Sequence, residues 1–171
     1  MDKTCMNYIL AEPYPAVSPQ KPDNNAARRL LGSYAGPQGE LTAILQYVYN
    51  SQLAPLAGAP QVGELFHCVS MVEMRHLELI GKLVLAYGGD PGYLYYQTPG
   101  RTAWWTGANV SYVKQPARML RDAIAGEEQA IAEYRRLAGS LQDSGAKALL
   151  QRIIADEEHH IALFTGALQK L

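Results

Sequence analysis

Two short motifs each occur twice in this chain of 171 residues, and their spacing constrains the fold more than any other feature of the sequence. The first motif reads G-E-x-x-A-I-x-x-Y and places its glutamate at position 40 and again at position 127. The second reads E-x-x-H, followed by an aliphatic residue, and begins at Glu73 and again at Glu157. The copies are 87 residues apart for the first motif and 84 for the second, so the two offsets nearly agree. The sequence therefore predicts two similar hairpins related by an approximate two-fold axis.

Apolar residues at three- and four-residue spacing predict four long helices and a shorter one before them. Short links between the first two long helices and between the last two make each pair an antiparallel hairpin. The connection over residues 88–115 is about 28 residues long, enough to run the full length of a bundle. The predicted fold class is all-α, a four-helix bundle of two antiparallel hairpins joined by a long crossover. The predicted helices cover residues 26–34, 37–53, 60–87, 116–138 and 143–171.

The first 35 residues are predicted to form an extended N-terminal arm with the short helix, and residues 36–171 to form the bundle. Four of the ten prolines lie in residues 1–24, so this stretch is expected to lie outside the core. Fifteen basic and 16 acidic residues leave a net charge of −1, which gives no field to attract nucleic acid or an anionic membrane. The two cysteines form neither a disulfide framework nor a C-x-x-C metal site, so a reducing, cytoplasmic location is expected.

The motif residues lie on the apolar faces of their helices. In the last helix, Glu157 and His160 continue an apolar stripe, whereas Asp156 and His159 share a stripe with Arg152 and are predicted to face water. The other long helices likewise point one glutamate, and in one case also a histidine, into the core. The predicted core set is Glu40, Glu73, His76, Glu127, Glu157 and His160.

Four buried carboxylates need either shared protons or cations, because an uncompensated buried charge costs several kcal/mol. Two divalent ions balance four carboxylates, and two neutral imidazoles complete the ligand set. One nitrogen ligand per ion among carboxylates suits Fe or Mn better than structural zinc. The sequence therefore predicts two ions per chain, Fe or Mn, with no catalytic residue beyond the metal centre. Tyr47 and Tyr134 are either core tyrosines bonded to a neighbouring glutamate or redox or proton-relay groups beside the ions.

The motifs resemble those of the ferritin-like di-iron and di-manganese carboxylate proteins over about residues 36–170. The 33 residues from Glu40 to Glu73 are similar to the spacing in bacterioferritins and rubrerythrins, and the stretch YAGPQGE at 34–40 resembles the first ligand helix of manganese catalases. The resemblance implies that Glu40 and Glu127 are terminal ligands and that Glu73 and Glu157 bridge the two ions. It also implies that His76 and His160 each bind one ion. The chain departs from rubrerythrins in having no C-x-x-C pair, and in Ala130, where they carry a further glutamate.

Three function classes remain open. The first is an oxidoreductase that acts on a small oxidant, peroxide or dioxygen, as a peroxidase or as a manganese catalase. The second is ferritin-like iron oxidation and storage, and the third a metal-stabilised structural protein such as a spore-coat component. The YAGPQGE stretch favours manganese and peroxide disproportionation. Six aromatic residues between Tyr93 and Tyr112 are predicted either to cap the core or to form a subunit interface in a homodimer or larger homo-oligomer.

Overall fold

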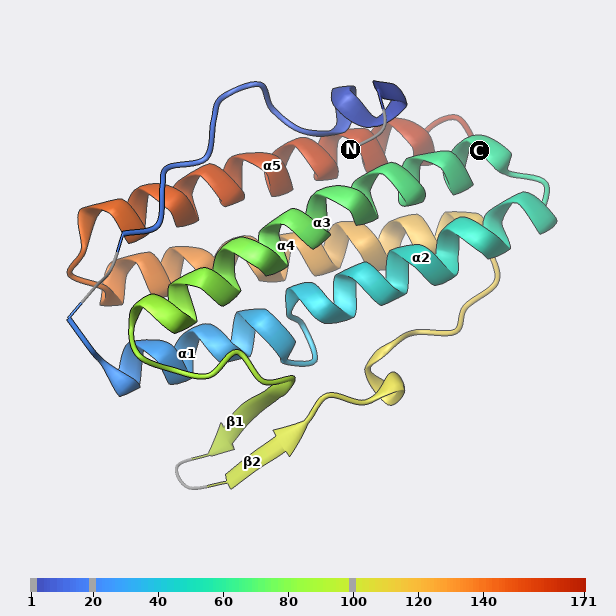
Figure 1. Ribbon diagram of the computed structural model, residues 1–171. Helices are drawn as coiled ribbons and strands as arrows, with labels where there is room; N and C mark the ends of the chain where they lie inside the picture. Colours follow the sequence, from blue (N-terminus) through green and yellow to red (C-terminus); the bar gives the residue numbers. More distant parts are fainter. Residues whose placement is uncertain (1–2, 19–20, 99–100) are drawn as a thin grey trace.

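The computed structural model describes residues 3–18, 21–98 and 101–171, and it is dominated by four long helices that lie side by side (Figure 1). Helix α2 pairs with α3, and α4 pairs with α5, each through a short link. A long crossover carries the chain from the end of α3 to the start of α4. The predicted all-α bundle of two hairpins and a crossover is confirmed. The helices are α1 Asn24–Ala35, α2 Glu40–Leu56, α3 Pro60–Ala86, α4 Pro116–Ser140 and α5 Ser144–Leu168.

Local sequence signals explain where three of the helices begin. Pro60 and Pro116 occupy the first turns of α3 and α4, where a missing N–H costs nothing. Asp143 caps α5 by accepting a hydrogen bond from the Ala146 N–H. The predicted start of the second helix at residue 37 is wrong, because residues 36–39 form a turn and α2 begins at Glu40.

The N-terminal arm lies closer to the core than the sequence predicted. Its 3₁₀ helix η1, Lys3–Tyr8, packs against α3 and α5, and a disulfide joins the fully buried Cys5 to Cys68. The expectation that residues 1–24 lie outside the core is therefore wrong for Cys5, and the cysteines no longer support a reducing compartment. Pro19 lies outside the described residues, and the division of the chain at residue 35 stays a prediction.

The crossover contains an antiparallel hairpin that the sequence analysis missed, with strands β1 Leu94–Thr98 and β2 Arg101–Trp104, followed by the short helix η2 Gly107–Asn109. Trp105 is partly buried and donates a hydrogen bond from Nε1 to Thr42 Oγ1 on α2. Most of the other aromatic rings do not cap the core, since the exposed ones include Tyr93, Tyr96, Trp104 and Tyr112.

Two apolar clusters fill the bundle, one at each end. The first joins α1 to the ends of α3 and α4 and the start of α5, and the second joins α2 to the opposite ends of the same helices. The ionisable core residues lie between the two clusters along α3, α4 and α5. Within the described ranges, no helix is long and apolar enough to cross a membrane.

Candidate metal centre

All six residues of the predicted core set meet in the layer between the apolar clusters, and none is more than 4% exposed. Helix α2 supplies Glu40 and α4 supplies Glu127, while α3 and α5 each supply a glutamate and a histidine. The i,i+3 spacing of each E-x-x-H motif stacks its two side chains on one helix face. We refer below to Glu40 and Glu127 as the terminal glutamates and to Glu73 and Glu157 as the shared glutamates.

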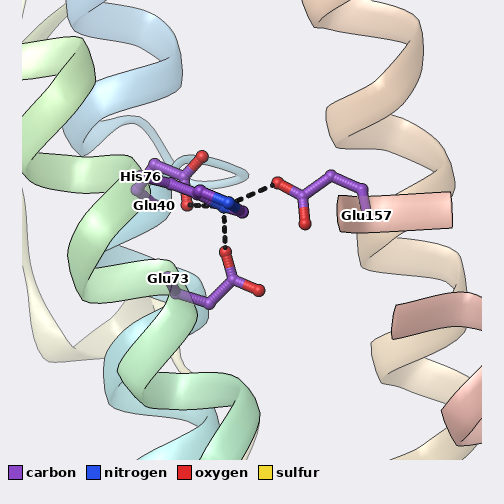
Figure 2. A group of neighbouring side chains, drawn as sticks. All are labelled: Glu40, Glu73, His76 and Glu157. Carbon is purple, nitrogen blue, oxygen red and sulfur yellow. Dashed lines mark hydrogen bonds and ion pairs between the residues drawn. The ribbon is translucent and has the colours of Figure 1, made fainter. Parts of the chain in front are cut away.

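The first group surrounds Nδ1 of His76 (Figure 2). This nitrogen lies 3.0 Å from Glu73 Oε2, 3.1 Å from Glu157 Oε1 and 4.0 Å from Glu40 Oε2. One ligand atom from each of the four residues lies within 4.8 Å of the others. The three carboxylates therefore converge on one nitrogen of a single imidazole.

The second group repeats this arrangement around Nδ1 of His160. The nitrogen lies 2.9 Å from Glu73 Oε1, 3.0 Å from Glu157 Oε2 and 3.8 Å from Glu127 Oε1. Each shared glutamate thus turns one oxygen toward each histidine. This arrangement suits two ions held side by side and bridged by two carboxylates.

Unsatisfied oxygen atoms test whether cations fit here. Oε1 of Glu73 and Oε1 of Glu157 are buried and accept no well-directed hydrogen bond among the described residues, although each faces a histidine nitrogen within 3.1 Å. A buried carboxylate oxygen without a hydrogen bond is costly unless a cation contacts it. The donor set, four carboxylates and two imidazoles, matches the ligand preferences of Fe and Mn.

Protons compensate the buried charge when no ion is bound. Burial, and then the charge of the shared glutamates, raises the pKa of Glu40 and Glu127 well above the usual range. Burial alone would lower the pKa of His76 and His160, but the adjacent carboxylates outweigh it and raise the pKa of both. Burial alone would raise the pKa of Glu73, but the two histidines outweigh it and lower the pKa. The layer therefore carries extra protons that a metal ion would displace.

Two tyrosines connect the hairpins across the centre. Tyr47 on α2 donates a hydrogen bond of 2.6 Å to Oε1 of Glu127 on α4. Tyr134 on α4 donates to Oε1 of Glu40 on α2, which makes the pair reciprocal. Of the two roles predicted for these tyrosines, a bond to a glutamate is observed, and in both cases the glutamate lies on the opposite hairpin.

Asp156 is a residue that the sequence analysis placed incorrectly. Its predicted exposure is wrong: the side chain is fully buried, with Oδ2 2.7 Å from Arg152 Nη1 and 3.2 Å from His76 Nε2. The residue shares its helix face with polar neighbours, but the N-terminal arm covers that face, which helical periodicity cannot reveal. A carboxylate on the outer nitrogen of a metal-binding histidine fixes the orientation of the ring. In the sequence, the one feature that could have indicated this role is that the aspartate directly precedes Glu157.

A cavity of about 490 Å³ lies between α2, α4 and the crossover and reaches three of the core glutamates, namely both terminal ones and Glu157. Glycine and alanine residues of the two first-motif copies line it, as do the exposed Gln38 and Gln129. The cavity therefore leads from solvent to the carboxylates. Gln46 exchanges two hydrogen bonds with the Ser111 backbone and so attaches the crossover to α2 beside the cavity.

Two hairpins packed around a buried layer of glutamates and histidines define the class of metal-carboxylate four-helix bundles. The model of the ferritin-like domain matches residues 38–171, and the chain belongs to this family. Similar sequences include a bacterioferritin of Mycobacterium leprae (strain TN), 32% identical over 126 residues, covering 71% of this chain and 72% of the relative. A manganese catalase of Lactiplantibacillus plantarum is 24% identical over 185 aligned positions, covering 90% of this chain and 67% of the relative.

Solved structures agree with these sequence matches. KatB, a manganese catalase from Anabaena PCC7120, superposes with a TM-score of 0.81 and 27% identity, covering 94% of this chain and 78% of KatB. The bacterioferritin BfrA of Mycobacterium tuberculosis gives a TM-score of 0.71 at 24% identity, with 88% of this chain and 87% of BfrA covered. The resemblance to ferritin-like metal-carboxylate proteins is thereby confirmed.

Proposed function

We propose that this chain binds two iron or manganese ions through the six core residues and uses them to consume hydrogen peroxide. Each ion would take one terminal glutamate and Nδ1 of one histidine, and the shared glutamates would bridge the two ions. The single observation that carries a reactive rather than a purely structural role is the cavity that leads from solvent to the terminal glutamates. A structural ion needs no such route, because closed coordination is what stabilises a fold.

Manganese is the ion we favour. In sequence, the manganese catalase relative covers 90% of this chain and the bacterioferritin relative 71%. In structure, KatB covers 94% at a TM-score of 0.81, and BfrA covers 88% at 0.71. The longer matches take in more of the chain than the bundle alone. This extent supports catalase-type chemistry, in which two molecules of hydrogen peroxide become one of dioxygen and two of water.

Two such ions would supply a two-electron exchange with peroxide, and a second peroxide molecule would return the electrons without an external reductant. The chain's own residues admit the substrate and hold protons beside it. Small residues of the first motif leave space next to the terminal glutamates, through which peroxide can reach them. Burial, and then the charge of Glu127, raises the pKa of Tyr47 well above its usual value. The tyrosine therefore keeps its hydroxyl proton, which it donates in the hydrogen bond to Glu127 Oε1.

The test is reconstitution of the metal-free protein with manganese and, separately, with iron. Peroxide loss and oxygen evolution are then followed with and without a reductant. Oxygen release by the manganese form supports a catalase, and reductant-dependent peroxide loss by the iron form supports a peroxidase. The proposal fails if neither form exceeds its free metal ion and a Glu73→Ala variant behaves identically.

Iron oxidation and storage is the second candidate, favoured by the bacterioferritin relatives at 30–32% identity. Particle size separates the two functions, since a storage shell contains many more subunits than a dimer. A metal-stabilised structural role is the third candidate and predicts bound metal without turnover.

We also propose that the protein works as a homodimer or larger homo-oligomer, with no nucleic-acid or membrane partner. The exposed crossover aromatics support an oligomer, because tyrosine and tryptophan are enriched at subunit interfaces.

A further inference from the structure

We infer that the N-terminal arm is the outer support of the metal centre: residues 5–14 position both histidine ligands, and the Cys5–Cys68 disulfide fastens the arm in place. This inference rests on the proposed metal site. It concerns the nitrogen of each histidine that faces away from the carboxylates.

Tyr14 supports the first histidine. Its hydroxyl lies 3.1 Å from His76 Nε2 and donates a hydrogen bond of 2.5 Å to Asp156 Oδ2. Arg152 lies against the other side of the tyrosine, with its guanidinium carbon 4.6 Å from the ring centroid. The outer nitrogen of His76 is therefore held by a carboxylate and a hydroxyl together, and the hydroxyl comes from the arm.

The backbone of the arm supports the second histidine. His160 Nε2 lies 3.1 Å from the carbonyl oxygen of Tyr8. The two E-x-x-H motifs are 84 residues apart, so the residue equivalent to Asp156 in the other hairpin is Val72, which has no carboxylate. The arm carbonyl thus takes the position that a carboxylate occupies at the first histidine, and the two halves of the centre differ in their outer contacts.

Several contacts attach the arm between these two points. Arg152 donates to the carbonyl oxygens of Glu12 and Leu10 at 2.7 and 2.8 Å, and the Leu10 N–H donates to Asp156 Oδ1 at 3.0 Å. The disulfide attaches η1 covalently to α3, five residues before Glu73. The arm is therefore fixed to α3 and α5, the helices that carry the two histidines.

These contacts set which nitrogen of each ring faces the carboxylates. With Nε2 occupied by the arm or by Asp156, Nδ1 is directed inward at both sites. Removing such an outer contact lowers metal affinity by about 10–100-fold in other metalloproteins. Because the two histidines have different partners, the loss of the Tyr14 hydroxyl should weaken one ion and leave the other unchanged.

Calorimetric titration with Mn²⁺ tests the role of Tyr14. We expect wild type to bind two ions, and Tyr14→Phe to bind one with unchanged affinity and the other about 10–100-fold more weakly. Tyr112→Phe is the matched control, because it also loses one hydrogen bond, from its hydroxyl to the Gly107 carbonyl in the crossover, and should bind as wild type does. Two unchanged affinities in Tyr14→Phe would overturn the inference, whereas no binding by wild type would instead refute the proposed metal site.

Reduction of the disulfide tests whether this bond holds the N-terminal arm in place. A phosphine reductant cleaves the S–S bond, takes the oxygen of one water as phosphine oxide and leaves two thiols that carry the two water hydrogens. We expect release of Mn²⁺ to a chelator, followed by the electron paramagnetic resonance signal of the ion, to become at least several-fold faster after reduction. Cys5→Ser should release quickly from the start and not respond to the phosphine. Counting of free thiols shows when reduction is complete. Equal release rates before and after complete reduction would show that the bond does not hold the arm. This measurement uses folded wild type and needs no variant.

Discussion

Each core histidine uses its two ring nitrogens for different tasks. Nδ1 lies about 3 Å from the shared glutamates, and Nε2 faces Asp156 and Tyr14 in one half and the Tyr8 carbonyl in the other. The imidazoles are consequently held in place before any ion arrives. At this scale the terminal and shared glutamates also differ, because each terminal one belongs to one ligand group and each shared one to both.

A terminal glutamate should therefore affect a single ion. Glu127→Gln is expected to retain one bound Mn²⁺ and to lose the other, since the group around His76 does not include Glu127. Glu128→Gln changes the adjacent, exposed residue and should keep both ions. Elemental analysis after removal of free metal gives the counts. Loss of both ions in Glu127→Gln, or of neither, would contradict the division into two groups.

Metal binding should release protons. Burial raises the pKa of the terminal glutamates and the adjacent carboxylates raise the pKa of both histidines, so these groups hold protons to higher pH than they would in solution, and the ions must displace those protons. Affinity for Mn²⁺ is accordingly expected to rise with pH. Calorimetry in buffers of different ionisation enthalpy measures the proton count, and a count near zero at pH 7 would contradict these assignments.

For the helices and strands, most of what the sequence predicted correctly came from the motif repeat and from the helical periodicity of the apolar residues. The burial of Glu73, Glu127 and Glu157 was predictable, because each stands among apolar residues that recur at helical spacing and so mark the buried face of the helix. The position of Asp156 was not, because it depends on an arm more than 140 residues earlier in the chain. The β1–β2 hairpin was missed for a related reason: its strands are short, and most of their side chains are not buried on one face.

The space between α2 and α4 should control access to the centre. A Cβ on Gly126 would meet open space, so Gly126→Leu can fill the cavity without displacing backbone. We expect full metal content but a kcat/KM for peroxide reduced about tenfold, equivalent to about 1.4 kcal/mol of transition-state stabilisation. Gly139→Leu, at another open helical glycine of α4 away from the cavity, gains the same helix propensity and should keep wild-type activity. Equal activity in the two variants would show that peroxide enters elsewhere.

For the whole molecule, the centre links stability to metal and to pH. Without ions, the raised pKa values of the terminal glutamates mean that the fold loses stability as pH rises above their ordinary value of 4.5. The raised pKa values of the histidines add stability below their ordinary value of 6.5, and that stability is also lost as pH rises. Bound ions oppose both effects, because the deprotonated groups are their ligands.

Chelation is therefore expected to lower the melting temperature more at pH 8 than at pH 5. An ion present at 100 times its dissociation constant adds about 2.7 kcal/mol to the free energy of unfolding. Differential scanning calorimetry of the metal-free and metal-loaded protein across this range measures the gap. A gap that is constant with pH, or that widens toward acid, would be inconsistent with a buried carboxylate site.

The metal content of the purified, manganese-reconstituted protein reports directly on the two-ion site. Wild type should contain two ions per chain. Glu157→Gln should contain no tightly bound ion because both groups share this residue, and Glu158→Gln, which changes the exposed neighbour, should contain two. A wild-type protein without stoichiometric metal, or a Glu157→Gln variant that still holds two ions, would contradict a two-ion site that shares this glutamate.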